Sequence, residues 1–407
     1  MSYIDFDYSP GKEDLVCRFY IEPQRGSSIE EACENVAKES SIGTWTDIVT
    51  MEPEIAQKLK PSIFEIDKEK NEMKIAYPSE LFEEGNMAQI LSSIAGNIFG
   101  MKTVENLRLV DVEFPENLVK SFKGPEFGIP GIRKILSVEE RPLVGTIIKP
   151  KVGLSPEKHA KVAYEAWIGG CDIVKDDENL TNQGFNRFED RLKRTLKARD
   201  RAEEENGGTK VYMPNVTAET KDMLKRAELV RDSGGRYIMV DIITVGFSAL
   251  QSLRDLNLRL VIHAHRAMHA ALTRNKKHGI SMLTIAKLAR IIGVDQLHIG
   301  TVVGKMVGPK EEVVAIRNAI TEEFFGLNAV FPVCSGGLHP GLVPDLVRIL
   351  GKDIIIQSGG GVHGHPDGTV KGAMAMRQAV DAVMEGIDLQ EYAENHEELR
   401  RALEKWR

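Results

Sequence analysis

The stretch Leu143-Val-Gly-Thr-Ile-Ile-Lys149 is a short apolar run that ends in a charged residue. Similar runs follow at 172–176, 210–215, 237–241, 259–265, 296–299, 331–335 and 354–358. Amphipathic stretches such as 156–168 and 282–292 separate most of them, and the spacing is roughly 30 residues, the length of one βαβ step. Eight strands that alternate with helices predict a (β/α)8 TIM barrel of about 250 residues.

Residues 1–124 have a different pattern. Strands are expected at 15–21, 62–67, 72–77 and 107–114, with helices at 29–40 and 87–95. Such a mixture in a compact unit indicates a small α+β domain. The expected protein is therefore of the α/β class. It has an N-terminal ferredoxin-like α+β domain (1–124) and a C-terminal TIM-barrel domain (125–407), whose charged tail at 390–407 is expected to form a solvated helix.

The composition excludes several classes of protein. The chain is 42% apolar and 28% charged, with a formal net charge of −7 and no run rich in Lys or Arg, so nucleic acid is not an expected partner. No stretch has the length and apolarity of a membrane span or a signal peptide. The four cysteines lie far apart and form no CxxC pair, which argues against a disulfide scaffold or zinc site and predicts a reducing cytoplasm.

Charged residues collect where the first two barrel strands end, which is where TIM barrels place function. The first strand ends in Lys149-Pro-Lys151, and period two puts both lysines on one side. The second ends in Lys175-Asp-Asp177-Glu178. Two carboxylates in a barrel mouth repel each other unless a cation joins them, and oxygen ligands suit magnesium. Solvated lysines and a simple salt-bridge cluster remain the alternatives.

The fifth strand ends in a run of histidines and an arginine. His265 is a candidate proton shuttle near neutral pH, and the fork of Arg266 suits a phosphate or carboxylate. His263 and His269 are expected to be structural, hydrogen-bonded histidines. Asp176, on the second strand, is expected to point away from the mouth.

The last three strands end in glycine-rich turns. His298 lies on the sixth strand, and Lys305 follows between glycines, where it is either part of a mobile lid or a surface lysine. Ser335-Gly336-Gly337 and Ser358-Gly359-Gly360-Gly361 follow strands seven and eight, where many barrels bind phosphate through backbone N–H groups. Together with a second phosphate near Arg266 and His298, these residues predict a magnesium-dependent enzyme for a doubly phosphorylated small molecule. These residues do not indicate which reaction the enzyme catalyses.

The motifs resemble those of the ribulose-bisphosphate carboxylase large subunit over nearly the whole chain. The matching stretches are Gly145–Lys151, Gly169–Asn179, His263–His269, His298–Lys305, Ser335–Gly337, Gly359–Gly361, Glu39–Thr46 and Gly96–Gly100. The stretch 184–188 and the short tail are closer to archaeal (form III) enzymes. Those enzymes work without a small subunit and consume ribulose bisphosphate made from nucleotides or sugar phosphates.

The resemblance implies that the enzyme adds CO2 and water to ribulose 1,5-bisphosphate and yields two 3-phosphoglycerates, with O2 as a competing substrate. Lys175 would carry an activating CO2 as a carbamate, which binds Mg2+ with Asp177 and Glu178. The carbamate would remove the C3 proton of the sugar, and the metal would hold the resulting enediolate.

The resemblance also implies the remaining catalytic roles. Lys149 would handle later protons, His265 would act at the C3 hydroxyl, and Lys305 would stabilise the added carboxylate. Ile147 stands where plant enzymes carry threonine, which puts the binding role of this position in doubt.

The substrate-binding set implied by the resemblance is Lys151, Arg266, His298, Ser335, Gly336, Gly337, Gly359, Gly360, Glu39, Thr44, Trp45 and Asn97. The last four belong to the N-terminal domain, which in this family covers the active site of a neighbouring subunit. A homodimer with shared active sites is therefore the expected working unit, and dimers could assemble further.

Two rival functions stay open. One is a carboxylase-like enolase or isomerase of methionine salvage, although such relatives typically lose the lid lysine or the second-phosphate residues, and Lys305, Arg266 and His298 are present here. The other is a non-catalytic sugar-phosphate-binding relative, since a fold does not imply a function.

Overall fold

The computed structural model describes residues 2–46, 48–304 and 309–406. The chain packs as two compact units. The first unit comprises 1–123, 268–292 and 324–326, and the second comprises 124–267, 293–323 and 327–407. The first unit therefore includes two segments from the part of the chain that also holds the barrel strands.

The first unit contains a mixed sheet in the strand order β10-β4-β1-β3-β2. Four of its strands pair antiparallel, and short β10 lies parallel to β4. Helices connect β1 to β2 and β3 to β4, which gives a βαββαβ order and confirms the ferredoxin-like prediction. The strands are β1 (Asp14–Pro23), β2 (Ser62–Asp67), β3 (Glu72–Pro78), β4 (Val104–Glu113) and β10 (Gly279–Ile280).

Alternation of apolar residues explains how this unit packs. Leu15, Cys17, Phe19 and Ile21 on β1 are fully buried, because side chains two residues apart lie on one face of a strand. The helical elements are α1 (Ile29–Glu39), α2 (Pro53–Leu59), η1 (Ser79–Leu81), α3 (Met87–Ile94), η2 (Asn97–Gly100), α4 (Glu116–Lys120), α11 (His269–Thr273) and α12 (Met282–Ile292).

The second unit contains the predicted barrel. Its eight strands lie in the order β7-β6-β5-β13-β12-β11-β9-β8, and each pairs parallel with its neighbour. An isolated parallel bridge between Asn215, two residues after β7, and Met239 on β8 brings the two edges of the sheet together. The strands are β5 (Leu143–Ile147), β6 (Ile173–Lys175), β7 (Val211–Met213), β8 (Tyr237–Asp241), β9 (Val261–His265), β11 (Gln296–Gly300), β12 (Phe331–Ser335) and β13 (Ile355–Gln357).

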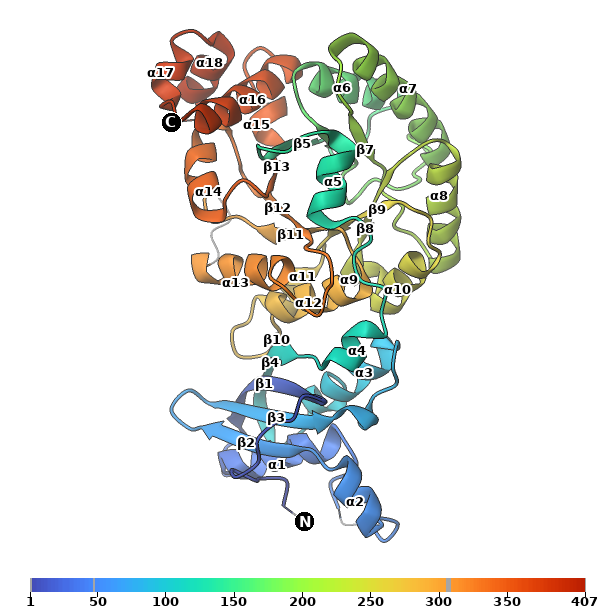
Figure 1. Cartoon of the computed structure of the whole chain (residues 1–407), viewed down its shortest axis with the longest axis vertical. Coiled ribbons are helices and arrows are strands. Elements are labelled where there is room, and N and C mark those ends of the chain that lie inside the picture. Colours follow the sequence, from blue (N-terminus) through green and yellow to red (C-terminus); the bar gives the residue numbers. More distant parts are fainter. Residues whose placement is uncertain (1, 47, 305–308, 407) are drawn as a thin grey trace. The chain divides into compact units, whose positions relative to one another are not determined.

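Helices surround these strands (Figure 1). The helix predicted at 156–168 has those bounds as α6, because Ser155 caps its first turn and Pro156 suits the first helical position. The helical elements of this unit are α5 (Gly128–Leu136), α6 (Pro156–Ile168), α7 (Phe188–Asn206), α8 (Thr220–Asp232), α9 (Ile242–Val245), α10 (Phe247–Asp255), α13 (Lys310–Thr321), η3 (Pro340–Leu342), α14 (Val343–Leu350), α15 (Gly360–His363), α16 (Thr369–Glu385), α17 (Leu389–Ala393) and α18 (Glu397–Lys405).

Helix α5 fills one end of the barrel. Its residues Ile132 and Leu136 are buried among residues from the starts of the strands, including Leu143, Val261 and Phe331. Since the amino ends of the strands are covered by this apolar cluster, the carboxyl ends form the mouth that is left for chemistry.

The prediction for the C-terminal tail was wrong in part. Two helices, α17 and α18, replace one continuous helix, and α18 is not simply solvated. Leu399 and Ala402 are buried, so one face of this short helix packs on the domain. Among the described residues, no helix has both the length and the apolarity needed to cross a bilayer.

Candidate active site

The lysines that follow β5 face the acidic residues that follow β6. Lys149 Nζ lies 2.9 Å from Asp177 Oδ2, and Lys151 Nζ lies 3.6 Å from Glu178 Oε1. The strands β5 and β6 pair directly, with Ile147 opposite Lys175. The structure therefore brings together all the residues predicted at the ends of the first two barrel strands.

Lys175 is the last residue of β6 and is almost completely buried, with 1% of its surface exposed. Its Nζ donates to the carbonyl oxygen of Asp176 at 2.9 Å and to Met239 Sδ at 3.1 Å. Burial lowers the pKa of Lys175, and this effect outweighs the attraction of the nearby carboxylates. The uncharged amine, which is the nucleophilic form, is therefore more available here than on an exposed lysine.

Asp177 is the buried anion beside it. Burial alone would raise the pKa of Asp177, but the hydrogen bond and the charge of Lys149 outweigh burial and lower the pKa. Its Oδ1 accepts from the backbone N–H of Asn179 at 3.2 Å. Asp177 thus stays ionised and presents a carboxylate oxygen in the mouth.

Asp176 points away from the barrel mouth, as predicted. It is completely buried, and its carboxylate accepts from Arg191 Nε at 3.0 Å, from the Tyr212 hydroxyl at 2.7 Å and from the Asn215 N–H at 3.0 Å. His159 Nε2 lies 3.0 Å away. Arg191 Nη2 also donates to the carbonyl oxygen of Thr181 at 2.7 Å, so this network anchors the chain on both sides of Asp177 and Glu178.

His265 ends β9, and its Nδ1 lies 2.8 Å from Asp241 Oδ1 at the end of β8. Its Nε2 lies 3.9 Å from Glu178 Oε2, so the free side of the ring faces the acidic cluster. Asp241 is buried and was missed at the sequence level. The available signal was a carboxylate at the last position of a barrel strand, the same signal that marked the second strand.

A chain of hydrogen bonds crosses three neighbouring strands. Gln296 Oε1 lies 2.8 Å from His263 Nδ1, the Nε2 atoms of His263 and His298 are 2.9 Å apart, and His298 Nδ1 lies 2.9 Å from Ser335 Oγ. Burial lowers the pKa of both histidines well below the ordinary value, so both rings are neutral at pH 7. His263 is structural as predicted, whereas Gln296 was not singled out.

Arg266 follows β9 and lies against Gly300. A β-carbon added at Gly300 would come within 2.8 Å of Arg266 Nη2, and Gly300 has φ +99°. A glycine at this position therefore leaves room for the guanidinium. Burial lowers the pKa of Arg266 to about 10, which still leaves it cationic at neutral pH.

The glycine-rich turns after β12 and β13 offer backbone donors. Within the described part of the chain, no hydrogen-bond acceptor is found for the N–H groups of Gly336, Gly337, Gly359 and Gly360. A β-carbon added at Gly359 would lie 3.2 Å from Lys149 Cε, so the turn after β13 adjoins the lysine. Unpaired N–H groups beside a cation form a suitable environment for an anion.

The four predicted residues of the N-terminal domain lie together in the first unit. Glu39, Thr44, Trp45 and Asn97 line one groove of about 670 Å³. Trp45 is 90% exposed, which is a large apolar surface for a single side chain. Lys305 lies outside the described residues.

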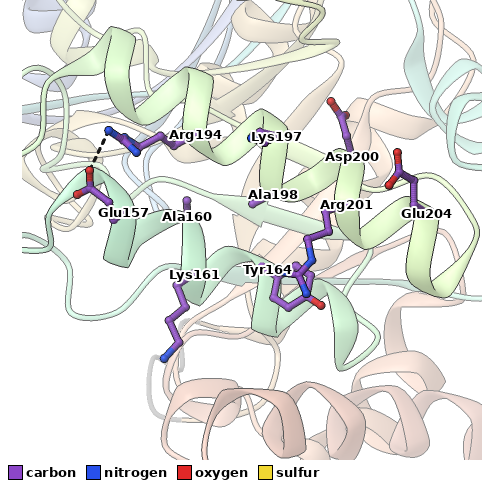
Figure 2. Close-up of a pocket in the computed structure, with 10 residues that line it drawn as sticks. All are labelled: Glu157, Ala160, Lys161, Tyr164, Arg194, Lys197, Ala198, Asp200, Arg201 and Glu204. Atoms are coloured by element: carbon purple, nitrogen blue, oxygen red, sulfur yellow. Dashed lines mark ion pairs between the residues drawn. The ribbon is translucent and has the colours of Figure 1, made fainter.

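A second hollow, between α6 and α7, is not part of this constellation. It measures about 600 Å³ and contains none of the predicted site residues (Figure 2). Both arginines that line it are paired: Arg194 lies 3.0 Å from Glu157, and Arg201 lies 2.7 Å from Glu205.

The acidic pair alone does not complete a metal site. Across 2–46, 48–304 and 309–406, no three His, Cys, Asp or Glu side chains are grouped as metal ligands. A cation held by Asp177 and Glu178 would therefore need another ligand from the chain or its substrate.

Comparisons with known proteins agree on one family. The family model described as "Ribulose bisphosphate carboxylase large chain, catalytic domain" matches residues 128–406, and the model of the N-terminal domain matches residues 2–118. The ribulose bisphosphate carboxylase of Methanosarcina mazei is 53% identical over 99% of this chain and 98% of its own. That of Methanocaldococcus jannaschii is 53% identical over the whole of both chains.

Solved structures are similarly close. The octameric ribulose-1,5-bisphosphate carboxylase/oxygenase of Pyrococcus horikoshii superposes with a TM-score of 0.96 at 51% identity, covering 99% of this chain and 96% of its own. The dimeric archaeal enzyme of Hyperthermus butylicus has a TM-score of 0.93 at 48% identity, and the match covers 99% of this chain and 98% of that one.

Proposed function

The chain belongs to the ribulose bisphosphate carboxylase large-chain family, and on that premise we propose how its barrel mouth carries out the reaction. The activity is that of a carboxy-lyase, in which CO2 and water are added to ribulose 1,5-bisphosphate to give two molecules of 3-phosphoglycerate. Reaction of the same substrate with O2 is the expected side activity.

The burial of Lys175 is the observation that best supports the proposed mechanism. Its buried amine has a lowered pKa and lies next in sequence to a run of acidic residues. The neutral amine attacks CO2: an N–C bond forms, the nitrogen releases a proton, and a carbamate results. Lys149 and Lys151 form ion pairs with Asp177 and Glu178. Their positive charges stabilise the negative charge that the carbamate adds nearby.

Asp177, Glu178 and the carbamate on Lys175 form the proposed Mg2+ site. Two carboxylates on consecutive residues provide two hard oxygen donors, and the carbamate would provide the third donor that the side chains alone lack. When bound, magnesium stabilises negative charge that develops on substrate oxygens. The donor set therefore fits the ion that this family generally uses.

Two side chains are placed to handle protons in the mouth. Lys149 reaches over Gly359 and contacts Asp177, so its ammonium can protonate a carbanion formed between the two phosphate sites. His265 faces the acidic cluster through Nε2, while Asp241 holds its Nδ1. We assign Lys149 to the later protonation and His265 to the C3 hydroxyl.

The two phosphates of the substrate would bind on opposite sides of this centre. The N–H groups of Gly336, Gly337, Gly359 and Gly360, which find no acceptor among the described residues, support one site. Arg266, with His298 and Ser335 beside it, supports the other. Lys151, half-exposed beside Glu178, would contact the substrate between them.

The residues of the N-terminal groove would complete a site in another subunit. Exposed Trp45 and the polar side chains of Glu39, Thr44 and Asn97 would then cover a partner's barrel mouth. A homodimer without a small subunit, which could assemble further, is the proposed working form. All four cysteines are buried free thiols, which supports a reducing, cytoplasmic location.

The first experiment measures fixed carbon. Purified protein is incubated anaerobically with Mg2+, labelled bicarbonate and ribulose 1,5-bisphosphate, and acid-stable label in 3-phosphoglycerate is counted. Label that depends on both Mg2+ and preincubation with CO2 is expected. Binding of the bisphosphate without label would favour an enolase-type or non-catalytic relative instead.

A further inference from the structure

The C-terminal helix α18 is fixed firmly to the barrel. The Glu398 carboxylate accepts from Lys371 Nζ at 2.7 Å and from Gln378 Nε2 at 3.0 Å. The backbone N–H of Leu399 donates to Gln378 Oε1 at 3.0 Å, and His365 Nε2 lies 3.0 Å from the Glu398 carbonyl oxygen. These bonds hold α18 against the segment that follows β13.

Trp406 follows directly after α18 and touches two loops at once. Its ring stacks on His339 with ring centroids 5.7 Å apart and planes inclined by 26°. Trp406 Cζ2 also lies 3.5 Å from the position of a β-carbon added at Gly364. Lys405 Nζ also hydrogen-bonds to the carbonyl oxygen of Gly364. The tail therefore bridges the loop after β12 and the segment after β13.

These two loops carry the glycines proposed to bind phosphate. His339 follows Gly336 and Gly337 by a few residues, and the N–H of Gly364 donates to the Gly360 carbonyl oxygen at 2.8 Å. The loops also meet on the inner side, where Ser358 Oγ donates to the Leu338 carbonyl oxygen at 2.7 Å. They are thus joined at two points, by Ser358 and by Trp406.

We propose that Trp406 is a positioning residue that holds the two glycine-rich loops at the separation needed to bind a phosphate group. Glycine-rich backbone loses much conformational freedom when it is ordered, so an uncharged clamp that orders it beforehand improves affinity without touching the ligand. This inference rests on the proposed function, because that function assigns the phosphate site to Gly336, Gly337, Gly359 and Gly360.

Steady-state kinetics of the full-length enzyme, activated with Mg2+ and CO2, provide the main test. In Trp406→Ala, the KM for ribulose 1,5-bisphosphate is expected to rise roughly three- to tenfold, the size expected for loss of one aromatic contact, with kcat within about twofold of wild type. Trp406→Phe, which keeps an aromatic face for His339, should recover most of the loss.

Tyr392→Ala is the matched control. Tyr392 stacks on His396 within the tail itself, with ring centroids 4.1 Å apart and planes inclined by 4°. The control removes an aromatic–histidine stack from the same region and should leave KM unchanged. Equal effects of Trp406→Ala and Tyr392→Ala on KM, kcat and melting temperature would mean that the tail only stabilises the fold and would overturn the inference.

A second measurement is independent of turnover. Binding of inorganic phosphate is followed by broadening of its 31P resonance. Trp406→Ala should weaken phosphate binding by about the same factor by which it raises KM. The proposed role of Trp406 is contradicted if phosphate binding and KM are both unchanged in this variant. It is also contradicted if the wild-type protein binds no phosphate. A wild-type protein that binds phosphate but fixes no CO2 contradicts the proposed function alone, and the phosphate measurement then decides the clamp.

Discussion

The carboxylate of Asp241 lies 2.8 Å from Nδ1 of His265, and the two residues stand opposite each other at the ends of the paired strands β8 and β9. A carboxylate accepts hydrogen bonds, so Asp241 favours a proton on Nδ1 of His265, although the backbone N–H of Ala267 also lies 3.3 Å from this nitrogen. Its Nε2 then lies on the side of Glu178 and the mouth. Asp241 acts through His265 and is a positioning residue.

Asp241→Asn is expected to reduce kcat by roughly 10- to 100-fold, because an amide can donate to Nδ1 and select the opposite tautomer. The KM for ribulose 1,5-bisphosphate should change little, since the side chain does not reach the phosphate loops. Steady-state kinetics of the purified variant provide the measurement. Wild-type kcat would show that the tautomer of His265 does not matter for the reaction.

Lys175→Ala should abolish both carboxylation and trapping of the activating CO2. The lowered pKa of Lys175 gives a second expectation: a larger share of the amine is uncharged at a given pH than for an ordinary lysine, so activation should rise with pH and begin at lower pH than an ordinary lysine would allow. Trapped label per subunit, measured with 14CO2 after chemical fixation, is the readout. Lys161→Ala, which changes an exposed lysine on α6 outside the barrel mouth, is the control and should retain the trapped label. Turnover by Lys175→Ala would disprove the carbamate assignment.

Asp176→Asn is expected to destabilise the barrel by about 3–5 kcal/mol, because it leaves the fully buried Arg191 without its counter-charge. Burial raises the pKa of Asp176, but Arg191 and His159 outweigh it and hold the pKa well below the ordinary value. The stability contributed by Asp176 is therefore present above the unfolded pKa of roughly 3.9 and is lost as the pH falls below it.

Thermal unfolding at a fixed protein concentration, near neutral pH and at several acidic pH values, tests this network. Asp190→Asn is the control, since Asp190 forms an exposed pair with Arg194 at 2.7 Å and should contribute less than about 1 kcal/mol. Equal melting temperatures for the two variants would mean that the buried network does not stabilise the fold.

Lys305→Ala should retain exchange of the C3 proton of ribulose 1,5-bisphosphate while carboxylation is lost. The resemblance assigns this lysine to the added carboxylate, so its positive charge is needed only after proton removal. Tritium exchange at C3 and fixation of labelled CO2 are measured on the same preparation. Lys310→Ala, at the exposed start of α13, is the control. Loss of both activities in Lys305→Ala would assign the lysine to binding or folding.

The sequence by itself determined the barrel and the place of its chemistry. Short apolar runs that alternate with amphipathic helices predict parallel strands, and parallel strands in a barrel end at the same mouth. Lys149, Lys175, Asp177 and Glu178 could therefore be grouped from their positions alone. The pairs that lie across strands were decided by the tertiary structure.

Asp241 with His265, and Gln296 with His263, come from strands separated by a helix or longer segment, and their distance depends on strand register and side-chain direction. The stack of Trp406 on His339 depends on how the tail packs. From the sequence, the tail could be predicted only to be charged and helical. Local pattern determines which side chains leave a strand at its end. Only packing of the whole chain determines which of them come within hydrogen-bonding or stacking distance.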